Sequence, residues 1–326
     1  MVVKQKRLGK TDLYVKPVGL GCMGLSHAYG DAVSEEEGIE FLKEAIKTDY
    51  NFFDTAKVYV GKTADGKTST NEEMLGAAIE SCRDNVVIAS KFGITLEGTS
   101  LVTDSSPESI QESIEGTLNR LDVDCLDLYY QHRIDPKIDP ETVAGEMQKL
   151  IDEGLIKAWG ISEANEEYLR RANEVCSVTA IQNRYSMLAR WHENMFPVCK
   201  ELDITFVAFS PLANGFLTGM YNPNSTFGIN DYRNDMPQYS EDGFEAAEKL
   251  MELLNDISEE KNATPAQISL AWMMSKEDFI IPIPGTTSIK NMESNFEAAK
   301  IKLSNSTVNK IDELMDVIDV PVFGGH

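Results

Sequence analysis

Short apolar runs alternate with longer amphipathic stretches along most of the chain. This alternation is typical of strands that alternate with helices, which build a parallel sheet. Eight such units in 326 residues favour a closed (β/α)8 TIM barrel over an open sheet, so we expect a single α/β domain over 1–326. The apolar runs that predict strands are 18–20, 51–53, 86–89, 126–130, 158–161, 179–182, 205–209 and 280–283.

Capping residues mark the starts of several helices. Ser34 with Glu37 matches a capping box, in which each side chain bonds the backbone N–H of the other residue. Proline at the first helical position follows Ser106 and Asp139, and Thr264 heads a segment that combines both signals. These four sites predict helices that begin directly after the capping residue.

Four further segments lie outside the repeating pattern. Two short apolar runs around a turn at 8–13 predict an N-terminal β-hairpin that caps the floor of the barrel. Three long polar stretches, 61–70, 95–106 and 220–242, follow the second, third and seventh predicted strands. Loops after barrel strands lie on the catalytic face, so we expect these three to border an active site.

The charge of the chain narrows its partners. With 53 acidic and 30 basic residues, the formal net charge is −23. A field of this sign repels nucleic acid and anionic membranes, so a small-molecule substrate is expected. An anionic cofactor would need a local basic pocket to bind. No run approaches the roughly 18 apolar residues of a membrane span. The five scattered cysteines form no metal-ligand motif, which predicts reduced thiols, a cytoplasmic location and no metal site.

Three of the predicted strands end in side chains that can carry acid–base chemistry. Asp54 and Tyr59 follow the second strand, while Lys91 ends the third and His132 follows the fourth. Any one of them could be structural, because such residues often cap helices, face solvent or pack. Together they predict carbonyl reduction with Tyr59 as the proton donor. Lys91, held by Asp54, would lower the pKa of the phenol, and His132 would orient the substrate oxygen.

The segments around these residues resemble the motifs of the aldo-keto reductase superfamily, in the same order. The similar segments are 54–59 (DTAKVY), 90–93 (SKFG) and 130–133 (YQHR), while 21–26 (GCMGLS) and 160–164 (GISEA) resemble its microbial and plant subgroup. The resemblance covers nearly the whole chain. It implies a TIM barrel, a nicotinamide cofactor that is usually NADPH, and a catalytic set of Asp54, Tyr59, Lys91 and His132.

Further segments resemble those that hold the cofactor in this family. The resemblance implies that Ser162, Asn165 and Gln182 bind the nicotinamide carboxamide and that Tyr185 stacks beneath the ring. Without the resemblance, Tyr185 could equally be a core residue and Arg233 a surface residue. Segment 209–219 resembles the pyrophosphate loop, in which small residues let backbone N–H groups approach an anion. The implied cofactor set is Ser162, Asn165, Gln182, Tyr185, Ser210, Pro211, Leu212, Gly215, Leu217, Gly219, Arg233, Gly285, Thr286, Lys290 and Asn295.

One departure from the family pattern concerns cofactor selectivity. Segment 283–288 resembles the adenosine-phosphate segment, with Thr286 as the phosphate contact. Many NADPH-specific relatives carry an arginine at the place of Asn291 and a glutamate at the place of Ser294, whereas Lys290 is the only basic residue in this stretch. We therefore expect NADPH to be preferred by a modest margin, with NADH also accepted.

The residues leave the substrate and the direction of the reaction open. Tyr29, Phe92 and Trp191 are expected to line a pocket for an aldehyde or ketone, without naming a molecule. The main alternative is a cofactor-binding regulatory subunit, because potassium-channel β subunits resemble this subgroup and keep the catalytic set. The second alternative is an alcohol or sugar dehydrogenase that runs the same chemistry in the oxidative direction.

Overall fold

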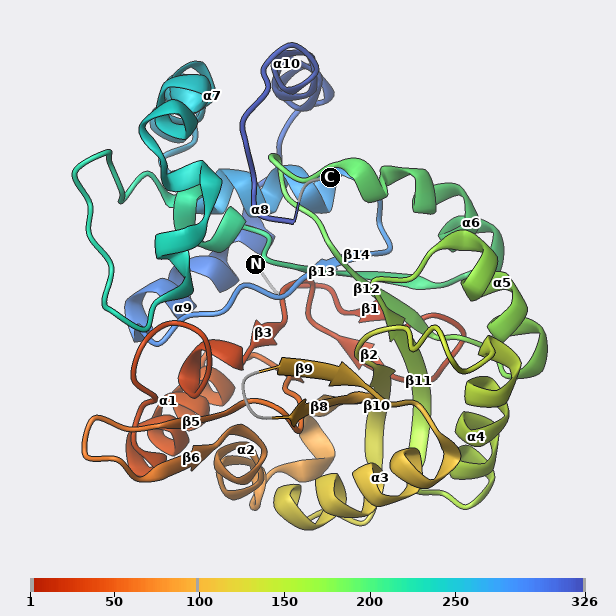
Figure 1. The fold of residues 1–326 in the computed structure, drawn as a ribbon. Coiled ribbons are helices and arrows are strands. Elements are labelled where there is room, and N and C mark those ends of the chain that lie inside the picture. Colours follow the sequence, from red (N-terminus) through yellow and green to blue (C-terminus); the bar gives the residue numbers. More distant parts are fainter. Residues whose placement is uncertain (1–2, 98–99, 325–326) are drawn as a thin grey trace.

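A closed barrel of parallel strands forms the centre of the molecule, as the sequence predicts (Figure 1). The computed structural model describes residues 3–97 and 100–324. Within these ranges eight strands pair in one sheet, and a parallel bridge between Gly21 and Gly285 joins its two edges. In barrel order the strands are β3 (Leu20–Gly21), β4 (Phe52–Asp54), β7 (Val87–Phe92), β10 (Leu126–Gln131), β11 (Ile156–Ser162), β12 (Ala180–Arg184), β13 (Thr205–Phe209) and β14 (Ile280–Pro282).

Helices cover the outside of the barrel, and in the described part of the chain one follows each strand (Figure 1). Two more, α7 (Glu241–Lys261) and α10 (Asn305–Met315), stand outside this ring. Among the described residues, none of the helices combines the length and apolar character needed to cross a membrane. The ring consists of α1 (Glu35–Lys47), α2 (Asn71–Ile79), α3 (Pro107–Leu121), α4 (Pro140–Asp152), α5 (Glu166–Val175), α6 (Phe196–Leu202), α8 (Pro265–Lys276) and α9 (Ile289–Glu297).

The predicted helix starts coincide with those of the structure. Ser34 and Thr264 each form a complete capping box at the start of α1 and α8. The Ser106 hydroxyl accepts the backbone N–H of Ser109 at the start of α3. Asp139 precedes α4 as predicted, but its side chain makes no capping hydrogen bond.

The N-terminal hairpin lies across the floor of the barrel, as predicted. It pairs β1 (Lys6–Arg7) with β2 (Tyr14–Val15), and Leu8 between them is fully buried against the barrel interior. The N–H of Gly9 donates to the Thr205 hydroxyl at 2.8 Å, which fixes the turn to the start of β13. The floor is therefore closed, and the opposite end of the barrel is left for chemistry.

The three long polar stretches differ from irregular loops. Two of them contain antiparallel hairpins, formed by β5 (Val60–Lys62) with β6 (Thr68–Thr70) and by β8 (Ile94–Glu97) with β9 (Ser100–Thr103). The third contains two short 3-10 turns, η5 (Tyr232–Asp235) and η6 (Pro237–Tyr239). These strands were not predicted because they are short and carry no sustained apolar alternation.

Alternation along the strands divides the side chains between two cores. In β7, Val87 and Ala89 point into the barrel, whereas Ile88 and Phe92 point outward to the helices. Lys91 continues the inward row at the open end of the strand, because successive side chains alternate. Gly160 makes room for the inward ring of Tyr130, since a Cβ there would lie 2.5 Å from Cε1 of that ring.

Candidate active site

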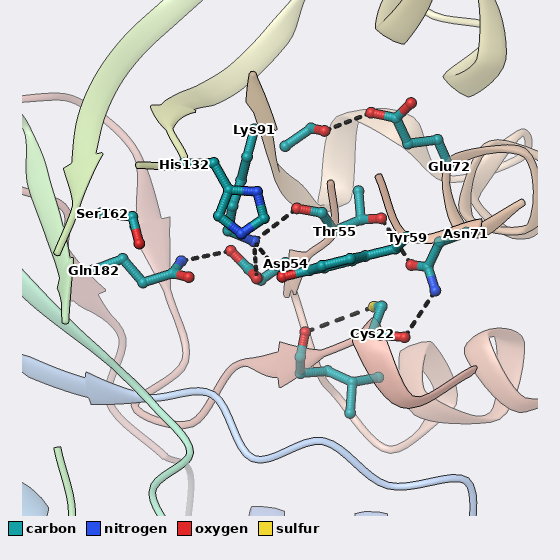
Figure 2. A network of polar contacts seen from close by, with 12 residues as sticks. Cys22, Asp54, Thr55, Tyr59, Asn71, Glu72, Lys91, His132, Ser162 and Gln182 are labelled. Carbon is teal, nitrogen blue, oxygen red and sulfur yellow. Dashed lines mark hydrogen bonds and ion pairs between the residues drawn. The ribbon is translucent and has the colours of Figure 1, made fainter. Parts of the chain in front are cut away.

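The Lys91 ammonium is the centre of a buried polar cluster at the open end of the barrel (Figure 2). Its Nζ lies 2.5 Å from Oδ1 of Asp54, 2.8 Å from the Thr55 carbonyl oxygen and 3.4 Å from the Tyr59 hydroxyl. Strands β4 and β7 are direct neighbours in the sheet. The register of these strands therefore brings together residues that lie 32 to 37 positions apart in the sequence.

Tyr59 is fixed by the turn that follows β4. Its N–H donates to the Ala56 carbonyl at 3.0 Å, and its own carbonyl accepts the Ser26 hydroxyl at 2.8 Å. The ring is almost completely buried and meets the His132 ring edge-on, with centroids 5.8 Å apart. Backbone bonds and packing thus hold the Tyr59 hydroxyl beside the ammonium before any ligand arrives.

Charge and burial determine the protonation of the cluster. Burial alone would lower the pKa of Lys91, but attraction to Asp54 and Tyr59 outweighs it and the pKa ends above its ordinary value. Burial raises the pKa of Tyr59 above its ordinary value, and the Lys91 ammonium offsets this only in part. Lys91 acts to lower the phenol pKa, as expected, but burial has the larger effect, so the expected net lowering does not occur. Tyr59 keeps its proton at neutral pH.

His132 is neutral at physiological pH. Burial, with a further contribution from the Lys91 charge, holds its pKa well below the ordinary value of 6.5. A neutral imidazole carries one N–H donor and one acceptor nitrogen. Figure 2 shows its ring together with the Lys91 ammonium and the Tyr59 hydroxyl, so these groups can act on one substrate oxygen.

Residues at the start of α2, which the sequence did not single out, support the cluster. Asn71 is fully buried, where its Nδ2 donates to the Cys22 carbonyl at 2.8 Å and its Oδ1 accepts the Thr55 hydroxyl at 2.7 Å (Figure 2). The next residue, Glu72, accepts the Ser90 hydroxyl at 2.5 Å, directly behind the lysine strand. Asparagine and glutamate are common in the first turn of a helix, so only their burial reveals this role.

Two residues of the predicted carboxamide site border the cluster. Ser162 and Gln182 are paired in the register of β11 and β12. Nε2 of Gln182 donates to Oδ2 of Asp54 at 2.7 Å, which joins this site to the buried Asp54–Lys91 ion pair. Amide and hydroxyl groups here suit a carboxamide, which both donates and accepts hydrogen bonds. Asn165 lies elsewhere: its exposed side chain caps α5 by accepting the Tyr168 N–H at 2.9 Å.

The structure gives Tyr185 no face for a cofactor. Its ring is fully buried, stacks on Trp272 at 5.6 Å and meets Phe196 and Phe206 edge-on. The predicted stacking role therefore does not fit, and Tyr185 is a core residue between strand and helices. Phe209 ends the inward row of β13, is partly exposed and packs on the barrel interior. It is the aromatic ring that the fold places at the mouth of the barrel.

The segment after β13 has the backbone expected of an anion-binding loop. Ser210, Ala213, Asn214 and Gly215 all have positive φ, between 48° and 101°. Glycine adopts this region freely, and the other three do so at some conformational cost. Backbone N–H groups in such irregular runs can converge on one anion. The loop 210–219 also contains Pro211, Leu212, Leu217 and Gly219 of the predicted set.

The predicted adenosine-phosphate segment is a helix start. Ser288 caps α9 by accepting the Asn291 N–H, and the Thr286 hydroxyl accepts the Ser288 N–H at 3.1 Å. Gly285 lies against the first barrel strand, where a Cβ would be 2.9 Å from the Gly21 carbonyl oxygen. Lys290 is exposed in the first turn of α9, while Asn295 is buried in the second. A helix N-terminus with one lysine suits a phosphate group.

Arg233 is already engaged in the described structure. It forms an ion pair with Asp231 at 2.5 Å, and its Nη1 donates to the Tyr221 hydroxyl at 2.7 Å. Its guanidinium also lies 4.4 Å from the centroid of the Phe227 ring and 5.2 Å from that of Tyr29. These contacts hold the 220–242 segment together, so a role in cofactor binding would require Arg233 to exchange partners.

Comparison with known proteins places this geometry in a family. The sequence model described as "Aldo/keto reductase family" matches residues 17–316. The chain belongs to this family. It is 36% identical over 321 residues to a soybean (Glycine max) protein named "Probable aldo-keto reductase 1". The match covers 98% of this chain and 90% of that protein. Membership makes the chain an NAD(P)H-dependent oxidoreductase.

Solved structures agree with the barrel. The glycerol dehydrogenase AKR11B4 from Gluconobacter oxydans superposes with a TM-score of 0.87 at 22% identity, over 100% of this chain and 99% of that one. At that identity the likeness shows the fold alone. A thermostable aldo-keto reductase, Tm1743, solved with the inhibitor epalrestat, has a TM-score of 0.76 at 28% identity, over 95% and 99% of the two chains.

The predicted pocket residues of this aldo/keto reductase family member do not lie together. Tyr29 borders the mouth, where its hydroxyl lies 3.0 Å from the Tyr232 hydroxyl. Phe92 is buried on the outer side of β7 against Tyr129, so its predicted pocket role was wrong. Strand alternation could have shown this, because Lys91 next to it points inward. Trp191 lies beyond β12 with an exposed side chain beside His192.

Proposed function

We propose that the protein reduces aldehydes or ketones to alcohols with NADPH, and that Tyr59 supplies the proton. The observation that carries the proposal is the buried Tyr59 hydroxyl 3.4 Å from a lysine ammonium that is itself paired with Asp54. A raised pKa keeps the phenol protonated, as a general acid must be. Family membership supports the coarser reaction, and this geometry supports the assignment of the donor.

In the proposed reaction, the bound nicotinamide provides the hydride for the carbonyl carbon. Side chains of the protein stabilise the negative charge that develops on the carbonyl oxygen. Neutral His132 donates a hydrogen bond to that oxygen and orients it, while Tyr59 transfers its proton to it. The resulting tyrosinate is stabilised by Lys91, whose charge is held in place by Asp54. The hydrogen-bonded Asp54–Gln182 pair keeps the carboxylate fixed during the transfer.

The proposed cofactor is NADPH, with NADH accepted less well. The positive-φ backbone of the 210–219 loop and the helix N-terminus of α9 support binding of the cofactor phosphates. Lys290 adds one positive charge near the second of these, on an otherwise acidic protein. Five free cysteines among the described residues agree with the proposed cytoplasmic location.

The test is the loss of NADPH absorbance with a panel of aldehydes and ketones, alongside fluorescence titration of the cofactor. We expect steady turnover with several of the carbonyl compounds. Tight cofactor binding without turnover of any substrate would contradict the proposal and favour the regulatory subunit. Assays with alcohols and NADP⁺ measure the reverse direction with the same protein.

A further inference from the structure

Two arginines lack the carboxylate partners that the others have. The chain contains nine arginines, and all of them lie in the described ranges. Seven form an ion pair with an aspartate or glutamate. Arg133 and Arg184 form none with the described residues, although the protein carries 53 acidic residues. Both lie at the mouth of the barrel, with their guanidinium groups 6.0 and 5.0 Å from the centroid of the Phe209 ring.

Arg133 follows the catalytic histidine directly. Its Nη1 donates to the His132 carbonyl at 2.7 Å and to the Ser162 hydroxyl at 3.2 Å. Its guanidinium lies 6.0 Å from the centroid of the Phe209 ring. These bonds use Nη1 alone, and a guanidinium carries five N–H donors. The remaining donors are held close to the reacting groups, where the Arg133 charge also acts to lower the pKa of Tyr59.

Arg184 occupies the inward row of β12, two residues beyond Gln182. Its guanidinium lies between two rings, 5.0 Å from the centroid of Phe209 and 5.4 Å from that of Phe323. Nη1 donates to Oδ1 of Asn214 at 3.2 Å, a neutral acceptor. Glu163 accepts the backbone N–H of Arg184 at 3.0 Å but makes no ion pair with its guanidinium. Burial lowers the pKa of Arg184, and attraction to Tyr232 and Glu163 offsets this effect only in part.

The position of the pair favours a substrate anion over a cofactor phosphate. The 210–219 loop, with its run of positive-φ residues, and the start of α9 beside Lys290 are the places proposed above for the cofactor phosphates. Arg133 instead touches Ser162 and the backbone of His132, which border the site of hydride and proton transfer. A guanidinium fork matches a carboxylate in two parallel hydrogen bonds.

We propose that Arg133 and Arg184 form an anion subsite beside the reacting carbonyl, which selects aldehydes or ketones that carry a carboxylate. The subsite rests on the proposed reductase function and adds the substrate class to it. The carboxylate would lie against the two guanidinium groups at the Phe209 ring, and its charge would supply the partner that neither arginine has among the described residues. Phe323, stacked on Arg184, would cover this end of the bound molecule.

The experiment compares para-carboxybenzaldehyde with its neutral methyl ester. We expect the wild type to have the higher kcat/KM for the acid. Arg184→Met should lower the ratio of acid to ester by about 10- to 100-fold, as for other charged hydrogen bonds, and leave the ester nearly unchanged. Arg184→Lys keeps the charge without the fork and should lose less. Arg171→Met is the matched control, because this exposed arginine pairs with Glu141 on the outer helices.

Cofactor binding separates the two possible anions. NADPH titrated by fluorescence should bind Arg184→Met as tightly as the wild type. Weaker NADPH binding, with equal losses for acid and ester, would assign the arginine to the cofactor diphosphate and overturn the proposal. An unchanged ratio of acid to ester in both Arg184 variants would overturn it as well.

A binding measurement tests the carboxylate subsite independently of turnover. If the wild type turned over neither aldehyde, nor any other carbonyl compound of the panel, the proposed function would fail. Calorimetry would then compare para-(hydroxymethyl)benzoate with its methyl ester on the NADPH complex of the wild type and of Arg184→Met. A preference for the acid that disappears in the variant supports the subsite. Equal binding of the two compounds to the wild type overturns it.

Discussion

The buried polar cluster around Lys91 and the start of α9 are two polar sites that differ in burial and in ion pairing. At the cluster, the Lys91 ammonium is buried and already holds three oxygen partners. At the start of α9, Lys290 is exposed and forms no ion pair with the described residues. The first site is organised by the protein alone, whereas the second leaves its charge for a ligand. Removing a single group at the first site should therefore cause a large loss of turnover. Substitutions at the second site should change cofactor affinity by smaller amounts.

Removing the Tyr59 hydroxyl is the strongest test of the organised site. Tyr59→Phe keeps the ring packed against His132 and removes only the proton donor. General acid catalysis contributes about 100- to 10,000-fold, so kcat should fall by that factor while the NADPH dissociation constant changes little. Stopped-flow or steady-state turnover checks this, and a variant that keeps more than about half of the wild-type rate excludes Tyr59 as the donor.

The Lys91–Asp54 pair should behave as one unit. Lys91→Met leaves a buried carboxylate without its partner, which typically costs about 3–5 kcal/mol of stability. It also removes the charge that stabilises the tyrosinate, so activity should fall and the apparent pKa of the acidic group in the pH–rate profile should rise. Urea unfolding and turnover of Lys91→Met, Asp54→Asn and the double variant measure both effects. Losses of activity that simply multiply in the double variant would contradict the coupled unit.

An arginine guanidinium placed at the start of α9 should increase the modest preference for NADPH over NADH. Asn291→Arg, in the first turn of α9, should strengthen NADPH binding by about 1–3 kcal/mol and make it more sensitive to salt. Lys290→Ala should lower the ratio of NADPH to NADH affinity. Fluorescence titration of both cofactors checks the two variants, and an unchanged ratio in Lys290→Ala would mean that the phosphate is held elsewhere.

Buried His132 should make stability depend on pH. Its pKa in the folded protein is well below 6.5, whereas the unfolded chain takes up a proton near that value. Below about pH 6.5 the unfolded state therefore binds more protons, and stability falls as pH falls, by up to about 1.4 kcal/mol per unit. His132→Gln should remove this component. Urea unfolding from about pH 7 down to about pH 5 compares the slopes, and parallel slopes would place His132 in a solvated environment.

Local patterns in the sequence predicted the elements of the barrel. Each apolar run became a barrel strand, and the capping residues at Ser34, Ser106 and Thr264 start helices where expected. These signals lie within a few neighbouring residues, so they do not depend on the rest of the chain. The strand-end residues Asp54 and Lys91 were also predictable, because a parallel barrel gathers the carboxyl ends of its strands at one face.

The sequence therefore determined the barrel, its capped floor and the strand ends that bring Asp54, Tyr59 and Lys91 together. Only the tertiary structure decided which way neighbouring side chains point and what they meet. Tyr185 faces the helices and Phe209 the mouth, Asn71 supports the cluster from a helix start, and Arg184 forms no ion pair with a carboxylate of residues 3–97 or 100–324. The physical reason is distance along the chain: burial, ion pairing and pKa depend on partners from other strands and helices, and only the closed barrel brings these together.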